Sequence, residues 1–415
     1  MTEGGAAGGW SEAPPGQTDD ATEPPLRVST LEIFFDLVFA FTLTQLTSVL
    51  ATQLSWLTVG KVLLIFGLLW WMYGAYAWLT NTRPPVHTAE RIGLLAGMAG
   101  FLVVGIAIPA GFGSYGVVLG LGYLIVVVVH AFLYYRVNTN IIRVAPFNIA
   151  SALLVIIAGL LHGPGGNADT AAYVLWVAAL AVQLGSPLIV HPAGLFHLRP
   201  AHFVERHSAL LIVAVGESVA AVGIGAAGPV SRPGGANWTL LGIALLGLVV
   251  AAALWWIVFG SGDDERAELA LLRVGPARRP AIALSAFFYG FIPLLLGLVG
   301  LAAGVLMAFT RIGAASASVG QTAVLACGAA LFLGGNAAIR RHLRIGPVWL
   351  RVLAAALALA TIAVGAVAGL DVQLVVVAVV LVAPLLAEGA LGRGALGQGA
   401  LGREPPGPVG RDAGG

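Results

Sequence analysis

The sequence predicts an all-α, polytopic integral membrane protein of about 12 transmembrane helices. Hydrophobic residues make up 59% of the chain and charged residues 10%, whereas soluble domains carry roughly 25% charged residues. The mean hydropathy is +0.93, and most charges lie between long apolar blocks. Membrane lipids are therefore the expected surroundings. A net charge of +2 with dispersed arginines argues against nucleic-acid binding.

Each apolar block is close to the ~20 residues that an α-helix needs to cross a bilayer, and charges with Gly or Pro mark the breaks. Only Gly369, Leu370 and Asp371 separate the last two blocks, which makes them the least distinct pair. The expected spans are roughly 31–50, 61–80, 92–110, 115–135, 146–162, 171–190, 207–226, 238–259, 281–301, 317–337, 349–369 and 372–388.

The distribution of lysine and arginine supports this count. With a cytoplasmic amino terminus, only Lys61, Arg232 and Arg311 of the 21 basic residues lie outside the cytoplasm. Basic residues concentrate in cytoplasmic loops, and one missed helix would scramble every later loop. We therefore expect both termini to be cytoplasmic. The Arg-rich, Gly- and Ala-rich composition suggests a GC-rich bacterial source, and hence the bacterial cytoplasmic (inner) membrane.

Three parts are predicted along the chain. Residues 1–30 are rich in Gly, Pro and acidic residues and lack the features of a signal peptide, so we expect a disordered cytoplasmic tail. Residues 31–388 form the transmembrane domain, with 31–190 and 200–388 as candidate six-helix halves. Residues 389–415 begin with GALGR, GALGQ and GALGR and are expected to form a low-complexity disordered tail.

Two carboxylates lie in the first span, STLEIFFDLVFAFTLTQLTSVL. Glu32 and Asp36 are four residues apart and therefore share one face of a helix. An ionised carboxylate at the centre of a membrane helix costs roughly 2.5–3.5 kcal/mol, so such residues are usually tied to a function or a partner. We interpret both as candidate ion- or proton-binding residues. The structural alternative is that Glu32 caps its helix while Asp36 pairs with an arginine.

A second polar stretch is HPAGLFHLRPAHFVERHSALLIVAVGESVAAVG. Glu217 lies between Gly216 and Ser218, well inside the seventh span, and is the deepest carboxylate along any span. It is therefore the strongest single candidate for ion or proton binding. Arg206 precedes Glu217 on the same helix face at a distance of about 16 Å along the axis, so the two cannot touch. The supporting residues of this stretch are Glu205, Arg206, His207 and Ser218.

Histidines cluster in the same stretch, which contains His191, His197, His202 and His207. Zinc needs three or four ligands in tetrahedral geometry, and these spacings match neither HExxH nor CxxC. The single cysteine, Cys327, excludes a disulfide framework within the chain. We expect no metal site and no cofactor, and we interpret the histidines as a solvated interfacial surface.

Other polar and aromatic residues in the spans have structural interpretations. Four lesser candidates could line a polar path, but single amides and histidines also join membrane helices by hydrogen bonds, and this structural role is favoured for each. They are His130, Asn148, Gln183 and Asn336. Aromatic residues near the cytoplasmic end of the second span are typical of an interfacial belt. They are Trp70, Trp71, Tyr73, Tyr76 and Trp78.

The two charged stretches resemble a known family. LEIFFDLVFAFTLTQLTSVL resembles the E-L-F-F-D-L-V-F segment of the bacterial low temperature requirement protein A (LtrA) family, and HFVERHSALLIVAVGESVAAVG resembles its E-R-H-G and A-L-G-E-S segment. Ser208 stands in place of the glycine that follows E-R-H. The resemblance covers roughly residues 26–388 and implies a multi-pass membrane protein without supplying a reaction. The positions that it picks out are Glu32, Phe35, Asp36, Glu205, Arg206, His207, Gly216, Glu217 and Ser218.

Three functions fit these observations. In a transporter or ion pathway, Asp36 and Glu217 bind a proton or small cation and exchange it as two halves rock. In a membrane-embedded enzyme acting on a lipid-like substrate, one of these carboxylates is a general acid or base. In a non-catalytic membrane protein, the buried charges pair with one another. The first is favoured, no catalytic residue is assigned, and an oligomer is compatible with the sequence.

Overall fold

The computed structural model describes residues 27–139, 141–161, 166–190, 198–230 and 238–401. Within these ranges, 12 helices are long and apolar enough to cross a membrane, which confirms an all-α, multi-pass membrane protein. Large apolar side chains remain exposed on the outside of the bundle, including Phe132, Leu188 and Val367. Such an apolar surface suits contact with lipid rather than water.

The spanning helices have the following bounds. They are α1 Thr30–Thr52, α2 Trp56–Thr82, α3 Thr88–Ala107, α4 Gly116–Tyr135, α5 Ile141–Leu160, α6 Gly166–Val190, α7 Pro200–Val230, α8 Trp238–Phe259, α11 Phe291–Thr310, α12 Val319–Leu343, α13 Trp349–Ala368 and α14 Leu370–Leu401. The shorter elements are a 3₁₀ turn Ile108–Ala110, helices α9 Asp263–Leu272 and α10 Arg279–Ala283, and a π-helical segment Leu284–Tyr289 that leads into α11.

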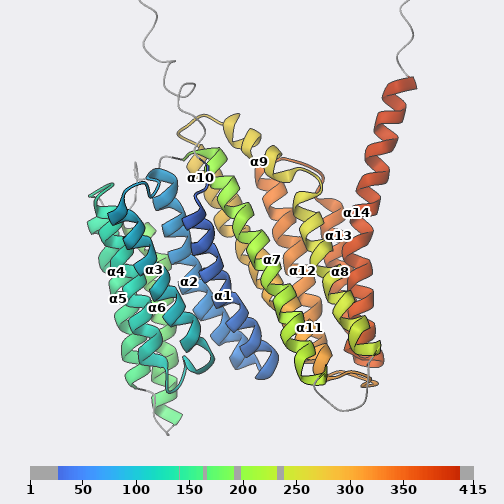
Figure 1. Ribbon diagram of the computed structural model, residues 1–415, viewed down its shortest axis with the longest axis horizontal. Helices are drawn as coiled ribbons and strands as arrows, with labels where there is room; N and C mark the ends of the chain where they lie inside the picture. Colours follow the sequence, from blue (N-terminus) through green and yellow to red (C-terminus); the bar gives the residue numbers. More distant parts are fainter. Residues whose placement is uncertain (1–26, 140, 162–165, 191–197, 231–237, 402–415) are drawn as a thin grey trace, which may run out of the picture.

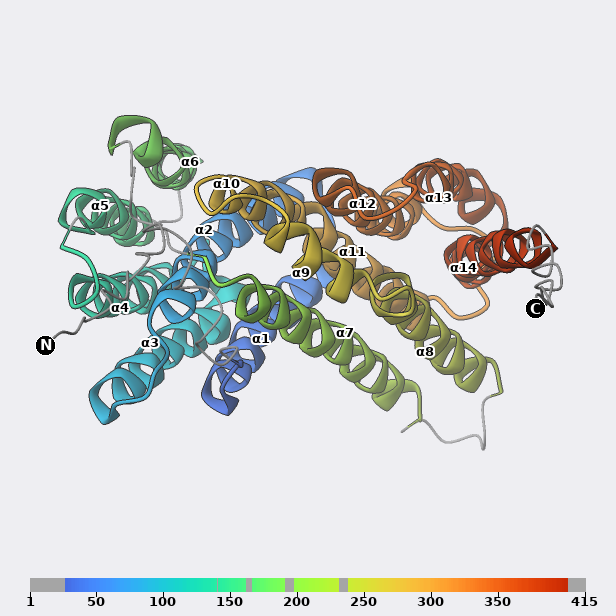
Figure 2. The same cartoon turned by 90° about the horizontal axis from the view of Figure 1, so that it is seen from above.

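The helices form an elongated bundle whose middle is built from α1, α7 and α11 (Figures 1 and 2). These three helices pack against one another. Helices α3 to α6 pack successively on one side, and α8 with α12 to α14 packs on the other. The two candidate halves therefore meet along α1, α7 and α11. Helix α1 begins and α14 ends at the same end of the bundle, the upper end in Figure 1.

The helices extend beyond their apolar cores. Helix α7 begins at Pro200 rather than at the predicted residue 207, because proline suits the first turn and charged residues such as Glu and Arg propagate a helix well. His202 and Arg206 therefore lie one turn apart on one face of α7. Helix α14 continues to Leu401, so residues 389–401 are helical where the sequence predicts a disordered tail. Ala, Leu and Arg in those repeats favour a helix, whereas the two glycines in each repeat disfavour it.

The aromatic residues of α2 form part of the core, so the prediction of an interfacial belt is wrong for most of them. Trp70, Tyr73 and Tyr76 are fully buried, and Trp78 is nearly so. Trp70 stacks on Phe291 of α11, and Tyr73 packs on Phe39 of α1. A helix that is apolar on every side gives no signal of which face meets protein and which meets lipid.

Close approach of α11 and α12 depends on glycine, and Gly328→Ala is expected to destabilise the protein. A Cβ built on Gly328 would lie 2.5 Å from the backbone nitrogen of Leu301 on α11, so the helices must separate. Overpacking of this kind costs about 1–3 kcal/mol, and thermal unfolding in detergent measures it. Gly334→Ala is the matched control on α12, since its Cβ meets nothing within 4 Å. Equal unfolding temperatures for the two variants would refute this account.

Candidate functional site

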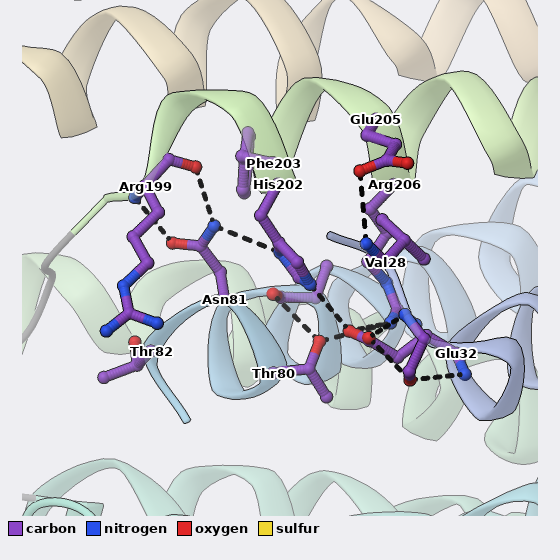
Figure 3. Close-up of polar contacts among 12 residues, drawn as sticks. Val28, Glu32, Thr80, Asn81, Thr82, Arg199, His202, Phe203, Glu205 and Arg206 are labelled. Atoms are coloured by element: carbon purple, nitrogen blue, oxygen red, sulfur yellow. Dashed lines mark hydrogen bonds and ion pairs between the residues drawn. The ribbon is translucent and has the colours of Figure 1, made fainter. Parts of the chain in front are cut away.

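Arg206 of α7 lies between the two carboxylates of α1. Its Nη1 donates to Glu32 Oε1 at 2.8 Å and its Nη2 donates to Asp36 Oδ1 at 3.1 Å. Figure 3 shows the arginine side chain pointing from α7 toward Glu32. All three side chains are at most 1% exposed. The predicted shared face of Glu32 and Asp36 is therefore the face that α1 presents to α7, and both carboxylates contact the same guanidinium.

Helix α2 supplies hydrogen bonds to this cluster. The Tyr73 hydroxyl donates to Asp36 Oδ1 at 2.9 Å, and Arg206 Nη1 also donates to Thr80 Oγ1 at 3.1 Å. The guanidinium carbon lies 5.7 Å from the centre of the Tyr73 ring, within the range of a cation–π interaction. We refer to Glu32, Asp36 and Arg206, with their partners Tyr73 and Thr80, as the Arg206 cluster.

The local sequence fixes the position of Glu32. Ser29 is the N-cap of α1, and Glu32 at the third helical position completes a capping box with it. The Ser29 hydroxyl donates to Glu32 Oε2 at 2.8 Å, as does the Ser29 backbone N–H at 2.9 Å. One carboxylate oxygen of Glu32 thus accepts hydrogen bonds from Ser29 at the start of α1, and the other accepts a hydrogen bond from Arg206. The structural role expected for Glu32 is present in this geometry.

His202 extends the cluster toward the end of α2. Asn81 Oδ1 accepts from the Arg199 backbone N–H at 3.0 Å, so Asn81 Nδ2 is the donor that faces His202 Nδ1 at 3.3 Å. The imidazole therefore accepts at Nδ1 and carries its hydrogen on Nε2, as a neutral tautomer. Nε2 lies 3.1 Å from Glu32 Oε1, a close contact that is not one of the hydrogen bonds of the described residues. Figure 3 shows this chain of contacts.

The formal charges of the Arg206 cluster do not balance. Two carboxylates face one guanidinium, and the neutral His202 adds no charge. Asp36 Oδ1 accepts two hydrogen bonds, whereas Asp36 Oδ2 is buried without a hydrogen-bond partner among the described residues. A buried, unpaired carboxylate oxygen is costly. The cluster therefore has one more negative than positive formal charge. Asp36 Oδ2 is the carboxylate oxygen of Asp36 that accepts no hydrogen bond from the described residues.

Glu217 lies outside the Arg206 cluster, farther along the same interface between α1 and α7. Its Oε2 accepts from the hydroxyl of Thr44 on α1 at 2.8 Å. Glu217 is half-buried, whereas Glu32 and Asp36 are fully buried. The deepest carboxylate by position along its span is thus not the most buried one. A small pocket beside it, lined also by Thr47, Ser218 and Leu298, has a volume of about 10 Å³, about enough for one water molecule.

The remaining residues of the predicted site are dispersed. Glu205 accepts from the Val28 backbone N–H at 3.1 Å and so fixes the chain ahead of α1. His207 Nδ1 bonds the Phe203 carbonyl at 2.8 Å, and its ring packs against Phe287. The Ser218 hydroxyl donates to the Ala214 carbonyl of its own helix at 3.3 Å. None of these three contacts the Arg206 cluster in the hydrogen bonds described here.

A second buried ionic cluster, which the sequence analysis missed, joins α9, α12, α13 and α14. Arg340 Nε and Nη2 donate to the two oxygens of Asp263 at 2.6 and 3.3 Å. Arg340 Nη1 donates to Glu388 Oε1 at 2.8 Å, and Arg351 Nη2 donates to Glu388 Oε2 at 2.9 Å. We call these four residues the Arg340 cluster. Two arginines face two carboxylates, so its formal charges balance.

The four lesser candidates make contacts between helices. Gln183 Nε2 donates to the Tyr123 hydroxyl and, at 3.4 Å, to Asn148 Oδ1. Asn336 Oδ1 accepts from Arg351 Nε at 3.2 Å, which extends the Arg340 cluster. The His130 ring meets the Tyr76 ring edge-on, with 5.2 Å between centroids. These contacts match the expected role of single polar residues in joining membrane helices.

The sequence analysis missed the contributions of α2 and of His202. Tyr73 and Thr80 are seven residues apart and so share a helix face. The assignment of Tyr73 to an interfacial belt hid this signal. His202 and Arg206 are separated by one turn, yet the predicted start of the seventh span excluded both. The predicted solvated histidine surface can be compared with the structure only at His202 and His207, since His191 and His197 lie outside the described residues. His202 and His207 are buried rather than solvated. No group of three metal-ligating side chains is found in the described ranges.

Comparisons with known proteins identify similar sequences over most of the chain. The model of a family described as bacterial low temperature requirement A protein (LtrA) matches residues 27–385. An uncharacterized protein of Rhizobium meliloti (strain 1021) is 25% identical over 289 residues, which cover 67% of this chain and 68% of that protein. The matched residues include both α1 and α7, the helices that form the Arg206 cluster.

Proposed function

The chain belongs to the bacterial low temperature requirement A family, and from that premise we propose that it is a proton-coupled transport protein with the Arg206 cluster as its proton-binding site. The observation that carries this proposal is the charge deficit. Glu32 and Asp36 share one guanidinium, and Asp36 Oδ2 is buried without a partner. One proton on Asp36 neutralises the cluster, and removal of that proton leaves a buried negative charge.

A proton fits this site better than a metal cation. The Arg206 guanidinium already occupies the space between the two carboxylates, at 2.8 Å from Glu32 and 3.1 Å from Asp36. A metal ion bound to both carboxylates would lie beside this positive charge. A proton adds to Oδ2 without displacing the hydrogen bonds that Oδ1 receives from Tyr73 and Arg206. The bound species is therefore assigned as a proton.

The interface between α1 and α7 offers a route from this site. Glu217 and Thr44 lie farther along it, beside the small pocket that reaches α11. Leu43 and Leu210 are buried and lie along α1 and α7 between the levels of the two carboxylates, so apolar side chains interrupt the route. Transfer between them requires α1 and α7 to move relative to each other, as in transporters whose halves rock about a central site.

We also propose that the chain lies in the bacterial cytoplasmic membrane with both termini in the cytoplasm. The support is the distribution of basic residues, of which Lys61 and Arg311 lie at the end of the bundle opposite to the start of α1. In this orientation the Arg206 cluster lies near the cytoplasmic end. The proton would enter from the cytoplasm and reach Glu217 only after a conformational change.

Asp36→Asn is expected to abolish proton flux in proteoliposomes. The asparagine side chain does not ionise and therefore cannot bind and release a proton, while Glu32 and Arg206 remain paired. A pH-sensitive dye inside the vesicles measures flux under an imposed pH gradient, with empty liposomes as the baseline. Glu265→Gln is the matched control, because Glu265 is exposed on α9 and its variant is expected to match the parent. Flux in Asp36→Asn equal to the parent, or flux of potassium or sodium without protons, would exclude this proposal.

In the same assay Glu217→Gln is expected to slow the flux without altering the Arg206 cluster. Thr44 still donates to the amide oxygen, so the packing of α1 on α7 is kept. A Glu217→Gln variant that transports at the parental rate would remove Glu217 from the route and leave Asp36 as the sole binding residue.

A purely structural cluster is the second candidate, and the capping box of Glu32 favours it. In that case the pairing of Asp36 with Arg206 serves only to hold α1 against α7. The parent would then show no proton flux, and Asp36→Asn would unfold at a lower temperature than the parent. The transport proposal expects Asp36→Asn to unfold at about the parental temperature, because asparagine is neutral like the protonated Asp36.

A further inference from the structure

A large apolar cavity lies beside the Arg206 cluster, on the other side of α2. Its volume is about 340 Å³, within the ~300–1,000 Å³ range of small-molecule sites. Helices α2, α4, α5 and α6 and the segment 280–289 enclose it. Trp71, Trp78 and Phe288 form much of its apolar wall. The proton site proposed above does not include this cavity.

Two buried polar side chains line the cavity without complete hydrogen bonding. His130 is 3% exposed and its Nε2 has no partner among the described residues, while the ring bonds the backbone of Ala75. Asn148 is also 3% exposed, and both of its hydrogen bonds, from Trp71 and Gln183, go to Oδ1. Asn148 Nδ2 takes part in neither of these hydrogen bonds, and it is not one of the fully buried unpaired atoms. His130 Nε2 is such an atom among the described residues, and an unpaired buried group implies a missing partner.

The wall on the side of α11 has an irregular backbone. Residues Leu284–Tyr289 form a π-helical segment, a feature found often at functional sites. The Phe288 carbonyl accepts from Trp70 Nε1 at 3.0 Å, which holds this segment against α2. A Cβ on Gly74 would meet the Phe288 ring at 2.7 Å, so glycine allows that ring to approach. Leu284 and Tyr289 line the cavity and are also exposed on the outside of the bundle.

We propose that this cavity binds a long-chain alcohol from the bilayer, with its hydroxyl between His130 and Asn148. A hydroxyl both donates and accepts, so it can pair with an acceptor nitrogen and with an amide donor at once. An unbranched or prenyl chain suits the apolar wall. The cavity is enclosed by membrane-spanning helices, and its exposed edge at Leu284 and Tyr289 faces the surface that contacts lipid. The ligand therefore enters from the membrane.

Quenching of tryptophan fluorescence tests this site, because Trp71 and Trp78 line it. The probes are ω-bromoundecanol and its methyl ether, whose bromine quenches tryptophan on contact, added to the full-length protein in nanodiscs. The ether accepts a hydrogen bond and cannot donate one. We expect saturable quenching by both probes, with the alcohol bound about fivefold more tightly, as one hydrogen bond provides. In His130→Phe the affinity for the alcohol should fall to the affinity for the ether.

A cavity-filling variant separates this site from partition into lipid. Ala75→Phe places a ring in the cavity and should remove the saturable component for both probes. Ala99→Phe is the matched control, because Ala99 is exposed on α3, and it should behave as the parent. Quenching that never saturates, equal affinities for the two probes in the parent, or parental quenching in a folded Ala75→Phe would each overturn the proposal. The comparison of the two probes in the parent decides the question if Ala75→Phe does not fold.

Discussion

Replacing Arg206 by methionine is expected to destabilise the protein by about 3–5 kcal/mol, the effect of removing one partner from a buried ionic cluster. The methionine fills a similar volume, so packing is largely kept. Glu32 and Asp36 then lose the guanidinium that contacts both of them, and the buried carboxylate of Glu32 remains without a cation. Chemical or thermal unfolding of the protein in detergent measures the loss.

The Arg206 prediction has a matched control and a rescue. Arg266→Met removes an arginine whose side chain is 53% exposed and 3.8 Å from its carboxylate partner, and it should change stability by less than about 1 kcal/mol. Adding Glu32→Gln and Asp36→Asn to Arg206→Met should recover much of the loss, since no uncompensated charge remains. An Arg206→Met protein as stable as the parent would show that the cluster is not closed to water.

Arg340→Met is expected to produce a loss of similar size, about 3–5 kcal/mol, at the opposite side of the bundle. Asp263 and Glu388 both depend on this guanidinium, and they join α9 and α14 to α12. Because the Arg340 cluster is balanced in charge, it needs no proton. Proton flux per folded molecule should therefore remain parental in this variant. The measurement is unfolding together with flux, on protein selected as folded by size-exclusion chromatography.

Arg341→Met is the control for Arg340→Met, since Arg341 is the next residue on α12 and is exposed. It should unfold and transport as the parent does. A loss of flux in Arg340→Met that exceeds the loss of folded protein would assign transport to the Arg340 cluster as well. That result would contradict the claim that the charge-balanced Arg340 cluster takes no part in proton transport while the unbalanced Arg206 cluster does.

The sequence predicted most of the architecture because crossing a bilayer imposes a length and a composition on each helix. The spacing of Glu32 and Asp36 also placed them on one face, where both contact Arg206. The Glu32 cap and an arginine partner for Asp36 were expected as the structural alternative. Both features are present, alongside the unpaired Asp36 Oδ2 that the proton proposal uses.

The remaining features depend on which helices are neighbours, and local pattern does not encode this. Tyr73 and Trp70 looked like interfacial residues because α2 is apolar on every side, yet α1 and α11 cover them. Arg340 and Arg351 were among the basic residues expected at the cytoplasmic side, although they are buried, at 2% and 0% exposed. Their carboxylate partners lie 77 and 37 residues away in the chain. The cavity around His130 arises only when five separate segments are assembled.

The most direct test of the central claim is infrared spectroscopy of the protein in lipid at neutral pH, which detects the C=O stretch of a protonated carboxylic acid. We predict such a band in the parent and in Glu217→Gln, and its loss in Asp36→Asn. The band should shift on exchange into D₂O, as expected for an exchangeable proton on Asp36. Absence of the band in the parent, or its persistence in Asp36→Asn, would show that the Arg206 cluster holds no proton on Asp36 and would contradict the proposed function.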